Sequence, residues 1–131
     1  EAITLYEQVA QDQARVLGTD HPRTLATLNN IAYTYRSVGR LPEAITLYEQ
    51  VMKDQIRILG DNHPGTYNTR RELADSYREA GRTDESIALY EQLLASSQRV
   101  LGDDHPFTMA MCEELEDVRR ELKQRDNPSA D

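Results

Sequence analysis

The sequence predicts an all-α protein, a right-handed solenoid of antiparallel helix pairs with six helices. Three observations predict it. The dipeptide His-Pro stands at residues 21, 63 and 105, so it returns every 42 residues. Glycine returns with the same spacing at residues 18, 60 and 102, and so does Tyr-Glu-Gln from residues 6, 48 and 90. No segment shows the sustained alternation of apolar and polar residues that indicates a strand.

The period extends through most of the chain. Residues 43–84 match residues 1–42 at 23 positions and residues 85–126 at 19 positions, which indicates copies of one ancestral unit. Such units bury their apolar faces only against their neighbours, so we predict one stacked domain over residues 1–125. Its predicted parts are the second helix of a truncated repeat at 1–20, complete repeats at 21–62 and 63–104, a capping helix at 105–125 and a disordered tail at 126–131.

Each complete repeat reads as two helices. Pro22 and Pro64 suit the first turn of a helix, where a missing N–H is no loss, and the histidine before each proline then falls near the N-cap. Gly39 and Gly81 predict the ends of the first helices, because glycine accepts the left-handed conformation that follows a helix. The predicted helices are 2–17, 22–38, 41–59, 64–80, 83–101 and 106–124.

The two ends of the array differ. Glu116, Arg119 and Lys123 stand where the earlier repeats carry alanine, tyrosine and glycine. An unpaired charge at a buried seam would cost about 3 kcal/mol or more, so we expect the last helix to face solvent as a cap. The first helix, by contrast, lacks its partner. We therefore expect the chain to be part of a longer protein, able to self-associate or exchange helices at this end.

Composition excludes several function classes. The formal net charge of −8 disfavours nucleic acid and anionic membranes as partners. No stretch approaches the roughly 20 apolar residues that a membrane span requires. Cys112 is the single cysteine, so no internal disulfide can form, and a reducing cytoplasmic location is expected.

One segment carries a family resemblance. The run from Thr27 to Ala32, Thr-Leu-Asn-Asn-Ile-Ala, followed by Tyr35, Gly39 and Ala44, resembles a tetratricopeptide repeat. The 42-residue period and the Leu-Gly-x-x-His-Pro joint resemble the variant found in kinesin light chains. Related arrays occur in bacterial proteins, often attached to nucleotide-binding signalling ATPases. The resemblance implies a non-catalytic interaction or scaffold module that binds a peptide or partner helix in a concave groove.

The resemblance also indicates which side chains face that groove. The implied positions are Asn29, Asn30, Tyr33, Arg36, Asn68, Arg71, Glu72, Asp75, Arg78, Glu113, Glu114 and Asp117. Because acidic residues gather in the last unit, we expect a protein or peptide partner with Lys or Arg at one end. Alternatively, these charges only solvate a surface. Outside the groove, Arg70 replaces the usually buried Leu28, so packing there should be looser or the arginine should reach outward.

The sequence offers no catalytic or metal-binding constellation. His21, His63 and His105 would lie about 10 Å apart in stacked repeats. Zinc ligands must lie about 2 Å from one ion, so these histidines cannot share a metal and instead suit helix caps. No Ser-His-Asp arrangement or glycine-rich phosphate loop is recognisable. We therefore predict no enzyme, no metal and no cofactor. Two alternatives remain open, a self-assembly module and a regulatory or sensor part of a larger signalling ATPase.

Overall fold

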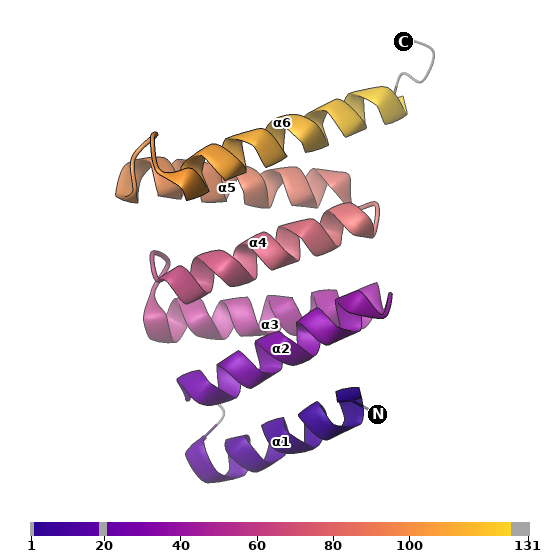
Figure 1. Ribbon diagram of the computed structural model, residues 1–131, viewed down its shortest axis with the longest axis vertical. Helices are drawn as coiled ribbons and strands as arrows, with labels where there is room; N and C mark the ends of the chain where they lie inside the picture. Colours follow the sequence, from indigo (N-terminus) through magenta and orange to yellow (C-terminus); the bar gives the residue numbers. More distant parts are fainter. Residues whose placement is uncertain (1, 19–20, 127–131) are drawn as a thin grey trace.

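The computed structural model describes residues 2–18 and 21–126, and these form a single stack of helices (Figure 1). The helices are α1 (Ala2–Leu17), α2 (Pro22–Ser37), α3 (Leu41–Leu59), α4 (Pro64–Glu79), α5 (Thr83–Val100) and α6 (Pro106–Asp126). The described residues include no strand. The prediction of an all-α solenoid with six helices is confirmed, with every helix end within two residues of its expected position. Asp126 was predicted to begin the tail but ends α6, and residues 127–131 lie outside the described ranges.

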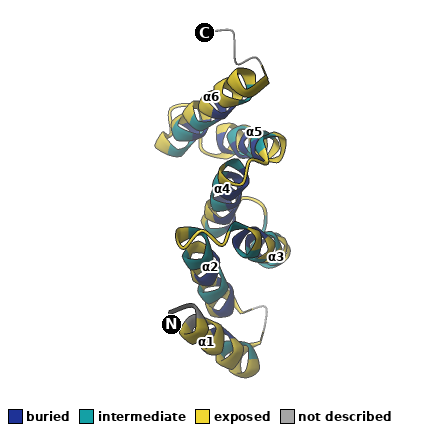
Figure 2. Ribbon diagram, turned by 90° about the vertical axis from the view of Figure 1, so that its right-hand side faces the viewer, coloured by how far each residue is buried: buried dark blue, intermediate teal, exposed yellow. Residues whose placement is uncertain are grey.

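The helices pack mainly on their neighbours along the chain. Each helix contacts the next one, and α2 also contacts α4. In the view turned by 90° about the vertical axis, α2 and α4 lie in one column and α3 and α5 in another (Figure 2). Buried residues face the seams between the columns, whereas α1 and α6 are largely exposed at the two ends of the stack. This nearest-neighbour packing is the defining property of a solenoid.

The His-Pro joints begin the first helix of each repeat. The imidazole Nδ1 atoms of His21, His63 and His105 accept a hydrogen bond from the backbone N–H two residues later, at 3.1, 3.0 and 3.1 Å. Each bond satisfies one of the N–H groups that a helix start leaves unpaired, so the predicted capping role is confirmed. The joint is closed further by Thr66, whose hydroxyl donates to the carbonyl oxygen of Gly60 at 3.0 Å.

Small residues let the helices of a repeat approach closely. Ala32 and Ala44 are fully buried where α2 meets α3, and Ala74 and Ser86 are fully buried where α4 meets α5. Replacing alanine by serine creates no unpaired polar group, because the Ser86 hydroxyl donates to the carbonyl oxygen of Ala74 at 2.9 Å. Serine is therefore accepted at this buried position as well as alanine.

A side-chain bond joins each second helix to the following first helix. The hydroxyl of Tyr35 donates to the Glu7 carboxylate, and the hydroxyl of Tyr77 donates to the Glu49 carboxylate in the same way. In the next repeat Arg119 replaces the tyrosine and donates to Glu91 at 2.8 Å. The arginine thus keeps the link, because a carboxylate accepts from a guanidinium as well as from a phenol.

Of the two expectations for Arg70, the outward reach was wrong. Arg70 is only 7% exposed, and its guanidinium lies 2.5 Å from a carboxylate oxygen of Asp61 in the preceding joint. The side chain is therefore buried at the position equivalent to Leu28, and its charge is neutralised by Asp61. The sequence comparison showed the replacement but did not indicate that Asp61 would reach it.

Candidate functional site

Polar side chains of α2, α4 and α6 line two adjoining hollows. The first hollow has a volume of about 500 Å³ and the second about 450 Å³. Residues lining the first are Tyr33, Arg36, Ser37, Asn68, Arg71, Glu72, Asp75 and Glu79. Residues lining the second are Arg36, Asp75, Arg78, Glu79, Glu114 and Glu121. Because they share three residues, the hollows form one continuous surface, which we call the polar groove.

The polar groove contains most of the predicted site. The predicted residues that line the first hollow are Tyr33, Arg36, Asn68, Arg71, Glu72 and Asp75. The predicted residues that line only the second hollow are Arg78 and Glu114. Four predicted residues line neither hollow. Asn29 instead accepts a hydrogen bond from the Thr69 hydroxyl at 3.3 Å, which joins α2 to α4. Asn30, Glu113 and Asp117 are exposed beyond the hollows.

Ion pairs between successive repeats run along the floor of the polar groove. The guanidinium of Arg36 lies 2.5 Å from Glu72 and 2.7 Å from Glu79, both on α4. One repeat later Arg78 lies 2.9 Å from Glu114 on α6 and also pairs with Glu121. We call these contacts the arginine ladder.

Sequence reasoning placed Arg36 and Arg78 in the groove but missed this pairing. The signal was present, because Glu72 and Glu114 are one period apart and so are Glu79 and Glu121. The ladder affects protonation as well as packing. The hydrogen bond donated by Arg78 holds the pKa of the Glu121 carboxyl below its usual range. Both arginines are half-buried, so these pairs are screened less than exposed pairs would be.

A buried tyrosine on α5, the second helix of its repeat, bonds to one of the carboxylates of the polar groove. The Tyr90 hydroxyl donates to Asp75, and burial followed by this bond raises the pKa of that hydroxyl. Tyr48 is the equivalent residue one repeat earlier, and the position corresponding to Asp75 is there occupied by Tyr33. The Tyr33 side chain turns outward and is 55% exposed. The first hollow therefore offers an exposed aromatic ring at its edge.

The hollows carry an excess of negative charge. Three carboxylates and two arginines line the first hollow, and four carboxylates and two arginines line the second. Both arginines of the ladder are already paired, and Arg71 lies 3.9 Å from Glu114. Such a surface suits a partner that brings cationic groups and hydrogen-bond donors.

The described ranges contain no group of three or more His, Cys, Asp or Glu side chains arranged for a metal ion. Within those ranges, no helix combines the length and the apolar character needed to cross a membrane. Cys112 is exposed, and its thiol lies 3.8 Å from a carboxylate oxygen of Glu116. The charged and amide side chains of the polar groove offer ion pairs and hydrogen bonds to a partner.

Comparison with protein families gives one matching model. The model described as tetratricopeptide repeat matches residues 1–55, 26–95 and 66–126. These overlapping segments together span nearly the whole chain. No curated protein sequence matches.

Solved structures share the fold. Two crystal structures of a candidate kinesin light chain from Podosopora anserina with nearly identical TPR-like repeats match with TM-scores of 0.84 and 0.83. Both are 35% identical and cover 96% of this chain. This chain spans only 59% and 60% of theirs. BtubC (BKLC) from P. vanneervenii matches 94% of this chain and 48% of its own at a TM-score of 0.79, but at 18% identity it shows the fold alone.

Proposed function

Because this chain belongs to the tetratricopeptide repeat family, whose arrays generally mediate protein–protein interactions, we propose that it is a non-catalytic interaction or scaffold module. The polar groove holds a peptide or a partner helix. The observation that carries this proposal is that six residues expected to face a partner line one hollow of about 500 Å³. This volume lies within the range of about 300 to 1,000 Å³ that is typical of ligand pockets.

The charges of the groove favour a partner with Lys or Arg at one end. Carboxylates outnumber arginines in both hollows, and the α6 end adds the exposed Glu113 and Asp117. At the α2 end, Tyr33 and Asn68 offer an aromatic ring and an amide without charge. A bound segment would then place its cationic residue near α6 and a polar or aromatic side chain near α2.

A peptide-display selection against the immobilised chain tests this proposal. Peptides selected by the wild type should lose affinity about tenfold or more for a Tyr33→Ala, Asn68→Ala, Arg71→Ala triple variant, since these side chains lie outside the arginine ladder. Glu113→Lys with Asp117→Lys should weaken binding of the same peptides. Asp84→Lys with Asp104→Lys, both exposed and outside the two hollows, is the control because it changes the net charge by the same amount. Selected peptides that bind all variants equally would refute the groove as the working surface.

Self-association through α1 is a second candidate function. Val9 is 39% exposed, whereas the equivalent Val51 and Leu93 are fully buried. Leu5 and Val16 on the same helix are exposed as well. Together with Leu17, Val9 and Val16 line an apolar hollow of about 320 Å³, so α1 presents a surface that a second copy could cover.

Mass measurement at increasing protein concentration separates the two candidates. Self-association predicts a mass that rises with concentration and returns to the monomer value in a Val9→Lys variant. Peptide capture predicts that groove variants change affinity without changing mass. A monomer at all concentrations would exclude self-association and leave the groove proposal intact.

Three finer expectations depend on more than this chain. A cytoplasmic location is favoured by the single, exposed thiol of Cys112, because secreted domains of this size more often carry disulfides. A bacterial origin and a role as the sensor of a larger signalling ATPase stay predictions. The presence of a nucleotide-binding domain in the full-length gene would support the sensor role.

A further inference from the structure

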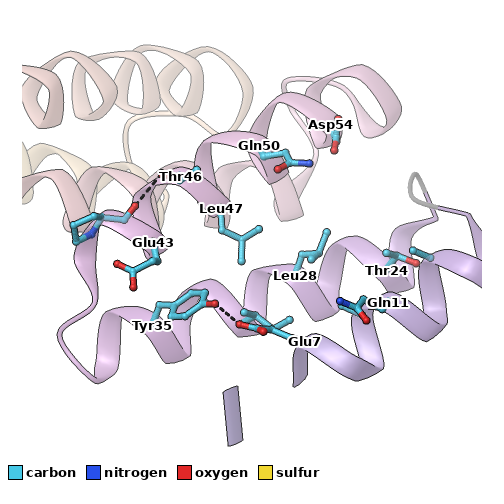
Figure 3. Close-up of a pocket in the computed structure, with 14 residues that line it drawn as sticks. Glu7, Gln11, Thr24, Leu28, Tyr35, Glu43, Thr46, Leu47, Gln50 and Asp54 are labelled. Atoms are coloured by element: carbon cyan, nitrogen blue, oxygen red, sulfur yellow. Dashed lines mark hydrogen bonds between the residues drawn. The ribbon is translucent and has the colours of Figure 1, made fainter. Parts of the chain in front are cut away.

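A second, apolar pocket lies away from the polar groove. It has a volume of about 640 Å³ and is formed by α1, α2 and α3 (Figure 3). Its floor is the face of α2 that carries Leu28 and Ile31, and α1 and α3 form its two walls. The α2 residues of the polar groove, Tyr33 and Arg36, are not among its lining, so the two sites use different faces of one helix.

The pocket exists because α1 carries small residues at two wall positions. Ala10 and Ala14 line it, whereas the equivalent positions one repeat later are Met52 and Ile56. Met52 packs against the core between α3 and α4. The floor also carries a larger side chain one repeat later, since the buried Arg70 replaces Leu28 in the next seam. The chain thus fills the second seam with larger side chains and leaves the first one open.

The lining combines apolar side chains at the floor of the pocket with carboxylates at its rim. Leu28 and Leu47 point into the space between the helices (Figure 3). The carboxylates of Glu7, Glu43 and Asp54 stand around them, and no Lys or Arg belongs to the lining. Each carboxylate already takes part in one contact, with Tyr35, Arg40 and Arg57 respectively. A carboxylate has two oxygens and accepts further donors, so the rim attracts cations.

The pocket is elongated along the helices. On α2 its lining runs from Thr24 to Tyr35, which is about 16 Å of helix or three turns. On α3 it runs from Pro42 to Asp54, a similar length. An extended peptide laid on Leu28 and its neighbours would bury backbone N–H and C=O groups without partners. A helix satisfies its own backbone, so it suits an apolar trough of this length better.

From these observations we propose that this pocket is a docking site for an amphipathic helix of a partner protein. The helix lays an apolar stripe of about three turns on Leu28, Ile31 and Leu47. Lysine or arginine residues that flank the stripe meet Glu7, Glu43 and Asp54 at the rim. The site is independent of the polar groove, so one chain can hold two partners at once.

A labelled peptide of about 14 residues, helical and built from leucine and lysine with leucine on one face, is the probe. Fluorescence anisotropy should show binding to the wild type that weakens about tenfold or more, equal to 1.4 kcal/mol, in an Ala10→Met, Ala14→Ile variant. That variant carries residues the chain already uses at the same positions of the next repeat, and circular dichroism verifies its fold. Ala88→Ile with Ala95→Met, at exposed positions of α5, is the matched control and should bind as the wild type does.

Four outcomes decide the proposal. Equal affinity for the pocket-filled variant would overturn it. If the wild type bound a scrambled leucine–lysine peptide with equal affinity, binding would be a charge effect only, and the proposal would be overturned. If it bound a leucine–glutamate peptide with the same apolar stripe equally well, the acidic rim would play no part, which would also overturn the proposal. The Asn68→Ala, Arg71→Ala variant should keep full affinity, and a loss there would assign the peptide to the polar groove instead.

Discussion

The guanidinium of Arg36 on α2 lies 2.5 Å from the carboxylate of Glu72 on α4, and the same contact recurs between Arg78 and Glu114 one repeat later. The partners are separated by 36 residues in both cases. In a solenoid, successive repeats are held together only by their shared seam. The arginine ladder therefore ties neighbouring repeats together in the polar groove.

Arg78→Ala should lower the free energy of unfolding by about 1 to 2 kcal/mol, because two carboxylates on α6 lose a charged donor while the site stays half-buried. Urea unfolding followed by circular dichroism measures this change. Arg120→Ala is the control, since Arg120 is exposed and pairs with Asp117 in its own helix, and it should change stability by less than about 0.5 kcal/mol. Equal losses in both variants would mean that the ladder does not join repeats.

Tyr77→Phe should destabilise the fold by about 1 kcal/mol, because it removes the hydrogen bond to Glu49 and keeps the ring. The guanidinium of Arg82, 4.5 Å from the ring centroid, keeps its contact in the variant. Arg119→Ala breaks the corresponding bond to Glu91, but that pair is half-exposed, so its loss should stay below about 0.5 kcal/mol. Thermal unfolding would contradict this order if the Arg119 variant were the less stable one.

Asp61→Ala should destabilise the protein by about 2 to 3 kcal/mol, because the buried guanidinium of Arg70 loses its carboxylate. Arg70→Leu should be neutral or stabilising, since leucine occupies the equivalent position at Leu28. In the background of Arg70→Leu, removal of Asp61 should then have little effect. A double-mutant cycle from denaturant unfolding measures the coupling, and additive effects would show that the pair is not coupled.

His63→Ala should cost about 1 kcal/mol, because the N–H of Gly65 loses the acceptor that caps α4. His63→Asn should retain most of the stability, since the asparagine side-chain oxygen accepts the same bond at an N-cap. Thermal unfolding monitored by circular dichroism compares the two variants. If asparagine were as damaging as alanine, the imidazole would contribute something other than a cap.

Stability should fall as the pH rises above about 10. Burial is the main cause that raises the pKa of Tyr48, Tyr77 and Tyr90 in the folded chain, whereas an unfolded tyrosine titrates near about 10. Above that pH the unfolded state loses protons that the folded state keeps. The contribution of these tyrosines to the free energy of unfolding is therefore fully present below about pH 10 and decreases above it. Urea midpoints measured on both sides of this pH test the prediction. A Tyr90→Phe variant should show a weaker pH dependence, and an unchanged dependence would contradict the assignment.

Much of the fold was predictable because its signals are local. Glycine and proline end and begin helices at the residues where they stand, so the His-Pro joints and Gly39 indicated the helix boundaries without any tertiary information. The small residues Ala32 and Ala44 marked the close helix contact through their period. Errors occurred where a side chain pairs with a residue outside its own helix, as Arg70 of α4 does with Asp61 in the preceding joint.

The candidate sites were predictable only in part. The family resemblance implied that Tyr33, Arg36 and Asn68 face one groove, and the structure brings them together in the polar groove. Asn29 belongs to the same stripe but bonds to Thr69, because α4 lies close enough to reach it. The apolar pocket was not predicted, since Ala10 becomes a pocket residue only when α1 and α3 stand on either side of α2.

The sequence by itself determined which segments are helical, through its apolar spacing and its glycine and proline positions, and its 42-residue period determined that repeats must stack. Those properties depend on backbone conformation and on an apolar stripe that recurs along the chain. The tertiary structure decided which charges pair, as Arg36 with Glu72, and where space is left, as beside Ala10. Ion pairs and cavities depend on side-chain lengths and on distances between helices, and these are set only once the helices pack.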